Sequence, residues 1–165
     1  MSEYKTLTHE FPPVYDKDSR ILILGSFPSV KSREVQFYYG HPQNRFWKVL
    51  AAVFGAPLPE STEEKKAFLA ENRIALWDVI EQCDIIGSDD SSIKNVVPTN
   101  LDRILETAQI RQIYCNGAVS HKLFCKYQAQ STGRTAVRLP STSPANAAWN
   151  PKRLIREWSV ILHEA

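Results

Sequence analysis

Four short apolar runs recur along the chain, at residues 20–25, 74–77, 112–116 and 135–139. The first ends at Gly25, the third is followed by Gly117 and the fourth by Pro140, residue types that commonly end strands. A strand that is apolar at nearly every position is buried on both faces, which is typical of a parallel sheet covered by helices. The runs therefore predict four strands of one such sheet.

The segments between these runs carry apolar residues at helical spacing. We expect helices over residues 44–54, 61–72, 101–108 and 117–127, and a last helix that starts at residue 151. Ser61 and Glu64 form a capping box, and Asn150 with Pro151 is a cap followed by a first-turn proline. The last helix should bury Leu154, Ile155, Trp158, Ile161 and Leu162. This order predicts a three-layer α/β/α fold with a short, mainly parallel four-stranded sheet.

Composition narrows the class of protein. The 165 residues suit a single domain, residues 1–165, and 43% hydrophobic with 23% charged residues is an ordinary globular mix. A net charge of +2 excludes a polybasic protein but leaves room for a local basic groove. No apolar run follows the N-terminal residues, none is long enough to span a bilayer, and the three cysteines form no C-x-x-C pair. We therefore expect a cytoplasmic monomer with no membrane contact, no metal and no other cofactor.

Candidate chemistry gathers after the strands, because ligands of open α/β sheets bind beyond the carboxyl ends of the strands. The unusual segments there are residues 25–29, Asn116 with Gly117, and residues 139–146. Taken singly, each is equally consistent with a plain turn or polar loop. Residues 38–47 add two tyrosines, a histidine, an asparagine and an arginine ahead of a helix. An aromatic plane beside an amide suits a flat heterocycle that stacks on one face and hydrogen-bonds at its edge.

Three of these segments together resemble one enzyme superfamily. The stretch His41-Pro-Gln-Asn-Arg-Phe-Trp-Lys-Val49 is similar to the H-P-x-N-R-F-W-K-V motif of mismatch-specific uracil-DNA glycosylases. Residues 25–29, Gly-Ser-Phe-Pro-Ser, resemble the first motif of the uracil-DNA glycosylase superfamily, and residues 139–146 occupy the place of its second motif. The serine-rich second loop and the Gly-Ser of the first motif are most like the hypoxanthine-DNA (deoxyinosine) glycosylases.

This resemblance implies a monofunctional repair glycosylase, associated with the nucleoid, that acts on DNA containing a deaminated base, hypoxanthine first. Asn44 matches the asparagine thought to be catalytic in the hypoxanthine family. The implied base pocket consists of Gly25, Ser26, Phe27, Pro28, Tyr39, His41 and Asn116, with Tyr39 stacking on the base. The implied DNA-binding and intercalating loop consists of Ser141, Thr142, Ser143, Pro144, Ala145 and Asn146. Phe27 departs from the water-positioning asparagine of mismatch-specific enzymes, and residues 26–27 lack the aspartate of uracil-specific ones.

Alternatives remain open at several positions. Asn44 is also an excellent helix cap, Asn116 could simply make a turn, and His41 is expected to orient the Asn44 turn rather than act directly. The segment 87–93 shows neither helical nor strand pattern, and we expect a surface loop there, with Asp89 and Asp90 on it. The rival functions are a uracil or mismatch glycosylase and a nucleic-acid-binding module with an inactive pocket.

Overall fold

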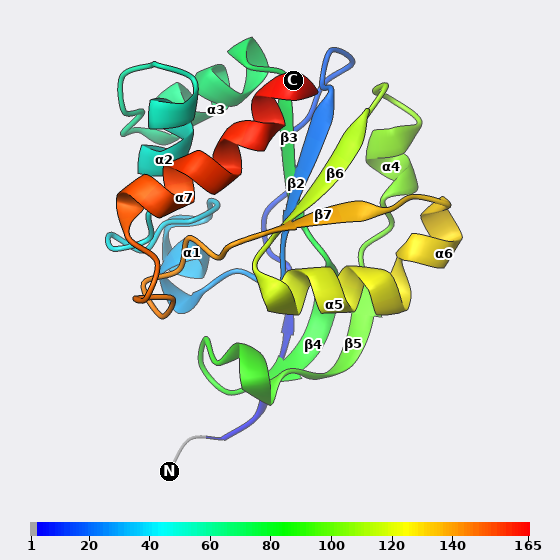
Figure 1. The fold of residues 1–165 in the computed structure, drawn as a ribbon. Coiled ribbons are helices and arrows are strands. Elements are labelled where there is room, and N and C mark those ends of the chain that lie inside the picture. Colours follow the sequence, from blue (N-terminus) through cyan, green and yellow to red (C-terminus); the bar gives the residue numbers. More distant parts are fainter. Residues whose placement is uncertain (1–2) are drawn as a thin grey trace.

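A parallel four-stranded sheet forms the centre of the computed structural model, which describes residues 3–165 (Figure 1). Its strands are β2 (Ile21–Gly25), β3 (Ile74–Asp78), β6 (Gln112–Asn116) and β7 (Ala136–Leu139), in the order β3-β2-β6-β7. All three strand pairs are parallel. Every residue of β2 and β3 is buried, as expected for strands covered on both faces. The predicted strands and fold class are confirmed.

Helices cover both faces of this sheet. On one side lie α2 (Phe46–Val53), α3 (Thr62–Glu71) and α7 (Pro151–Trp158), and α2 packs against α7. On the other side lie α4 (Asp102–Leu105), α5 (Ala118–Tyr127) and α6 (Ala129–Thr132). A short helix, α1 (Val30–Val35), follows the loop after β2. The chain therefore leaves β2 toward one face and β6 toward the other, which makes a topological switch point between these neighbouring strands.

A second, antiparallel sheet was not expected from the sequence. It contains β1 (Lys5–Thr8), β4 (Ile80–Ile85) and β5 (Lys94–Pro98) in the order β1-β4-β5, and the short 3-10 turn η1 (Asp90–Ser92) lies between β4 and β5. Strands β1 and β5 are mostly exposed, with no fully buried residue. Such edge strands lack the apolar run by which the buried strands were recognised.

The predicted helix starts are confirmed by their caps. Ser61 Oγ accepts a hydrogen bond from Glu64 N–H at 3.0 Å, and Asn150 Oδ1 accepts one from Arg153 N–H at 2.9 Å. The stripe predicted for the last helix is wrong at its end, because Leu162 is 46% exposed. The α-helix changes there to the 3-10 turn η2 (Ser159–His163), whose tighter winding rotates Leu162 toward solvent.

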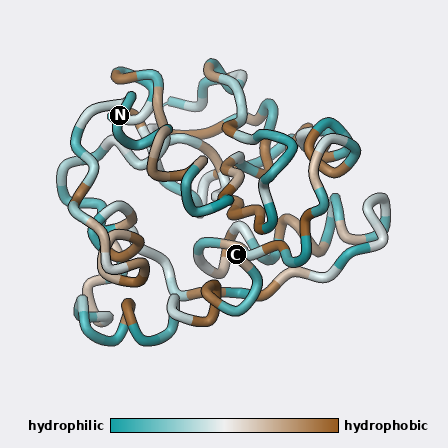
Figure 2. Tube along the Cα trace, turned by 90° about the horizontal axis from the view of Figure 1, so that it is seen from above, coloured by the Kyte–Doolittle hydropathy of each residue, from teal (hydrophilic) through white to brown (hydrophobic). Residues whose placement is uncertain are grey.

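The hydrophobic core joins the sheet to the helices on both faces. Its largest fully buried members include Trp158, Phe46, Phe124 and the apolar residues of β2. Seen from above, hydrophobic stretches run through the middle of the trace, while the outer loops are mostly hydrophilic or neutral (Figure 2). Within residues 3–165, no helix combines the length and the apolar character that crossing a membrane would require.

Candidate active site

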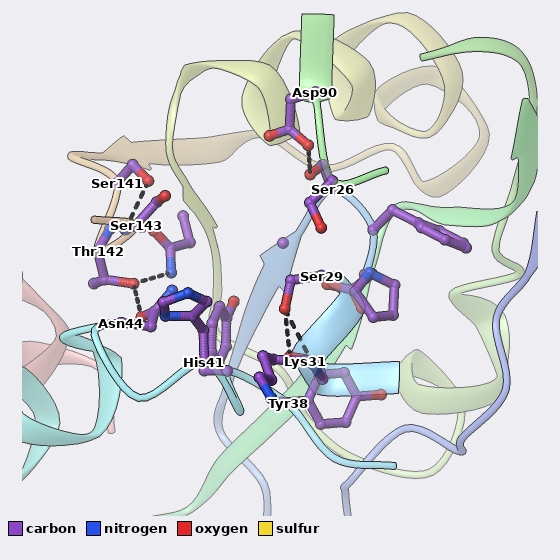
Figure 3. Close-up of a pocket in the computed structure, with 18 of the residues that line it drawn as sticks. Ser26, Ser29, Lys31, Tyr38, His41, Asn44, Asp90, Ser141, Thr142 and Ser143 are labelled. Atoms are coloured by element: carbon purple, nitrogen blue, oxygen red, sulfur yellow. Dashed lines mark hydrogen bonds between the residues drawn. The ribbon is translucent and has the colours of Figure 1, made fainter. Parts of the chain in front are cut away.

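A pocket of about 520 Å³ opens at the switch point between β2 and β6. It is bounded by the loop after β2, by the segment before α2, by the end of β6 and by the loop after β7 (Figure 3). All the residues expected to form the base pocket line it, namely Gly25, Ser26, Phe27, Pro28, Tyr39, His41 and Asn116. Asn44 and residues 141–145 line it too, whereas Asn146 lines a neighbouring pocket. The fold thus brings together segments that are far apart in the sequence.

Asn116 fastens the loop after β7 to the end of β6. Its Nδ2 donates to Thr142 Oγ1 at 3.0 Å, and its Oδ1 accepts from Thr142 N–H at 3.0 Å. Thr142 is fully buried, although the loop around it is polar. Asn116 therefore does more than make a turn, because both ends of its amide hold the predicted intercalating loop at the pocket wall.

Asn44 uses its carbonyl oxygen entirely for structure. Oδ1 accepts a hydrogen bond from the N–H of Phe46, the first residue of α2, at 2.9 Å, and another from Thr142 Oγ1 at 2.8 Å, although the N-cap residue of α2 is Arg45 rather than Asn44. A carbonyl oxygen has two lone pairs, so both are occupied. Nδ2 makes no hydrogen bond to any residue in the described part of the chain. Asn44 thus presents a fixed, unused N–H₂ group at the pocket.

Arg45, the next residue, binds the same loop through several hydrogen bonds. Its guanidinium donates to the backbone carbonyls of Ser143 at 2.9 Å and Asn146 at 3.1 Å, and also to that of Trp149. Its backbone N–H donates to Thr142 O at 3.1 Å. The planar fork of donors suits this set of converging carbonyls, which a lysine could not satisfy equally. The predicted catalytic segment and the predicted intercalating loop are therefore one hydrogen-bonded unit.

An ion pair lies under the pocket floor. Asp78, the last residue of β3, accepts from His9 Nε2 through Oδ2 at 2.8 Å, and both side chains are at most 5% exposed. Burial lowers the pKa of His9, but the hydrogen bond and charge of Asp78 outweigh it and raise the pKa overall. A Cβ atom at Gly25 would lie 2.5 Å from Asp78 Oδ1, so any larger residue there would force the carboxylate, which is paired with His9, to move. The absence of a side chain lets this carboxylate reach the pocket.

Tyr39 stands beside this floor. Its ring stacks on Phe46 with centroids 3.9 Å apart, so only its other face is left for a ligand. Its hydroxyl is buried without a hydrogen-bond partner among the described residues, and a Cβ at Gly25 would lie 3.1 Å from it. Burial and the Asp78 carboxylate raise the pKa of Tyr39 against the lowering effect of the nearby Asn116 side chain, so the phenol stays neutral. Its φ of 53° is in the left-handed region, which is uncommon for a tyrosine and typical of functional sites.

Comparison with known proteins places this geometry in a family. The model of the uracil DNA glycosylase superfamily matches residues 12–161. The chain belongs to this superfamily. A hypoxanthine DNA glycosylase of Methanosarcina acetivorans is 35% identical over 92% of this chain and 95% of its own, and one of Methanosarcina barkeri is 41% identical over 52% and 54%. A solution NMR structure from Methanosarcina acetivorans, of a protein proposed to be a uracil DNA glycosylase, has a TM-score of 0.79 at 34% identity over 92% of this chain and 94% of that one.

The surface loop expected in this uracil DNA glycosylase superfamily member also borders the site. Residues 87–91 are exposed, as expected, but Asp90 lines the pocket as well and accepts from Ser26 Oγ at 3.1 Å (Figure 3). Partial desolvation and the negative charges of Asp78 and Asp89 raise the pKa of its carboxyl, whereas the hydrogen bond from Ser26 lowers it. Sequence reasoning also missed Asp78, although it directly follows a predicted strand and so carried the same signal as Asn116.

Proposed function

We propose that this protein is a monofunctional DNA glycosylase that removes hypoxanthine from deoxyinosine in DNA. The observation that carries the proposal is the pocket at the switch point, which is lined by Asn44, Tyr39 and residues 141–145, and where the N–H₂ of Asn44 has no hydrogen-bond partner among the described residues. The 35% identity to a hypoxanthine DNA glycosylase over 92% of the chain supports the same substrate.

The reaction needs a flipped base, a stabilised leaving group and a placed water molecule. The loop after β7, held by Arg45 and Asn116, fills the gap in the duplex while the base enters the pocket. Because both lone pairs of Asn44 Oδ1 are occupied, Asn44 acts through Nδ2, which donates to the departing base as negative charge develops on it. The remaining face of the Tyr39 ring holds the base by stacking, worth about 1–3 kcal/mol.

The polar groups of Asp78 and Tyr39 at the pocket floor favour the binding of deaminated purines over that of adenine. Deamination of adenine turns N1 from a hydrogen-bond acceptor into an N–H donor and replaces the exocyclic amine with a carbonyl. The carboxylate of Asp78, whose Oδ2 is paired with His9, can accept from that N–H, whereas the N1 lone pair of adenine would face it unfavourably. The unpartnered hydroxyl of Tyr39 supplies a donor for a base carbonyl beside it.

The decisive experiment incubates the protein with labelled duplexes that carry deoxyinosine, uracil, xanthine or only normal bases, followed by alkali. We expect cleavage first and fastest at deoxyinosine, and no cleavage of normal DNA. A uracil or mismatch glycosylase is the second candidate, favoured by the His41–Val49 stretch, and it predicts uracil opposite guanine as the best substrate. Binding without cleavage of any duplex would indicate an inactive module, the reading favoured by Phe27.

A further inference from the structure

Few groups in the pocket can take a proton from an attacking water molecule. Asn44 Oδ1 already accepts two hydrogen bonds. His41 Nδ1 accepts from Gln43 N–H at 3.1 Å, which puts the proton of a neutral ring on Nε2 and leaves the imidazole no free acceptor. Among the described residues that line the pocket, the carboxylates are those of Asp78 and Asp90. A water molecule that hydrolyses a glycosidic bond therefore has these two groups as its candidate proton acceptors.

The depth of the two carboxylates distinguishes them. A flipped nucleotide enters its pocket base first, so the C1′ atom stays nearer the mouth than the base does. Asp78 is 4% exposed and lies at the floor, where His9 engages its Oδ2. Asp90 is exposed and lines both this pocket and the neighbouring one of about 540 Å³, which share part of the loop after β7 as a wall. Asp90 is thus nearer the mouth of the pocket than Asp78, on the side from which C1′ would approach.

We propose that Asp90 is the general base that activates the hydrolytic water, an inference that rests on the proposed glycosylase function. The bond between the water oxygen and C1′ forms as the C1′–N9 bond breaks, and the electron pair of that bond leaves with hypoxanthine. One proton of the water passes to the Asp90 carboxylate, which later releases it to solvent, and the departing base anion takes up a proton from solvent. Ser26 Oγ holds Oδ1 of the carboxylate at 3.1 Å, while Oδ2 makes no hydrogen bond to the described residues.

The groups around Asp90 set the pH range of this step. Partial desolvation of the Asp90 carboxyl raises its pKa, and the negative charges of Asp78 on β3 and of the neighbouring Asp89 raise it further. The hydrogen bond from the Ser26 hydroxyl lowers it. Cys83 on β4 stays a neutral thiol, because burial raises its pKa to about 11. The other titratable side chains that line the two pockets are those of Lys31, Tyr38, Tyr39, His41, Arg138 and Glu157, and burial raises the pKa of both tyrosines. Since the ionised carboxylate is the active form, base release should slow as the pH falls through the raised pKa of Asp90.

Single-turnover release of hypoxanthine from a deoxyinosine duplex, measured from pH 5 to 9, tests this role. Asp90→Asn should release the base at least about 10²-fold more slowly at pH 8 and lose the acidic limb of the profile. Its binding to a duplex with a hydrolysis-resistant 2′-fluoro-deoxyinosine should stay within about twofold of wild type. Ser26→Ala removes the hydrogen bond that favours the ionised carboxylate, so its acidic limb should move to higher pH.

Asp89→Asn is the matched control, because it removes the same charge from the same turn. It should keep the wild-type rate at pH 8, and its acidic limb should move to lower pH, opposite to Ser26→Ala. Release by Asp90→Asn within threefold of wild type, or an unchanged acidic limb in both Asp90→Asn and Ser26→Ala, overturns the role of Asp90 alone. Wild-type protein inactive on every deaminated base would instead overturn the proposed function and this role with it.

Discussion

Replacing Asn44 with aspartate separates its two roles, because only the unused half of the side chain changes its chemistry. The carboxylate still offers acceptors to Phe46 N–H and Thr142 Oγ1, the groups that Oδ1 now serves at 2.9 and 2.8 Å. What disappears is the N–H₂ group, which donates to the leaving base in the proposed mechanism. Loss of one preorganised donor costs about 2.7–4 kcal/mol of transition-state stabilisation, so base release should slow by roughly 10²–10³-fold.

The melting temperature should change differently in Asn44→Asp and Asn44→Ala. Asn44→Asp keeps both acceptor contacts and should melt within about 2 °C of wild type. Asn44→Ala removes the acceptor of the first N–H of α2, worth about 1 kcal/mol, and leaves the fully buried Thr142 hydroxyl without its acceptor, worth about 1–3 kcal/mol more. A chain of this size loses roughly 2–4 °C per kcal/mol, so Asn44→Ala should melt several degrees lower.

The assay combines thermal melting with single-turnover release of hypoxanthine at saturating enzyme, followed by alkaline cleavage of the abasic strand. Asn44→Ser serves as a second variant that can still accept a hydrogen bond at the helix start but lacks the amide donor. If folded Asn44→Asp and Asn44→Ser both release the base within threefold of the wild-type rate, Asn44 is a structural cap and its catalytic assignment is wrong.

Three further predictions concern the loop after β7 and whether base release depends on a metal ion. Arg45→Lys should lower the melting temperature by roughly 4–8 °C, because an ammonium group cannot hydrogen-bond to all the carbonyls that the guanidinium contacts, at a cost of about 2 kcal/mol. An unchanged melting temperature would show that these hydrogen bonds do not stabilise the fold. Replacing Ser143 and Asn146 with glycine should weaken activity on duplex DNA more than on single strands, since only a duplex needs its gap filled, and equal losses would argue against intercalation. Base release should continue in EDTA, and a loss restored by zinc or magnesium would show that the site has been misinterpreted.

Much of the sheet and part of the site follow from local sequence signals. Gly25 and Asn116 end apolar runs, and the carboxyl ends of parallel strands meet at one edge, so their convergence on the pocket could be expected. Asp78 satisfies the same rule, but the apolar run that predicts β3 ends at Trp77, so the acidic residue directly after it carries no apolar signal of its own. Asn44 was recognised through its motif, yet the sequence could not show which end of its amide is free.

Other site residues depend on long-range contacts that leave no local signal. Asp90 reaches Ser26 only because β4 and β5 form a hairpin that returns the chain toward the pocket, and these partly exposed strands lack a clear apolar pattern. His9 reaches Asp78 from the segment after β1, across 69 residues of sequence. The hydrogen bonds of Arg45 to the loop after β7 also leave no sequence signal, because its partners are backbone carbonyls, whose direction is set by loop geometry rather than by residue type.

A monofunctional glycosylase should release hypoxanthine as an intact free base while the DNA strand stays unbroken. Chromatography of the small-molecule products, run beside a gel of the strand without alkali, measures both outcomes in one reaction on a deoxyinosine duplex. We predict one free hypoxanthine per abasic site formed, an uncut strand before alkali, and no adenine released from the matched deoxyadenosine duplex. Release of uracil from a uracil duplex without release of hypoxanthine would contradict the proposed function, as would strand cleavage before alkali.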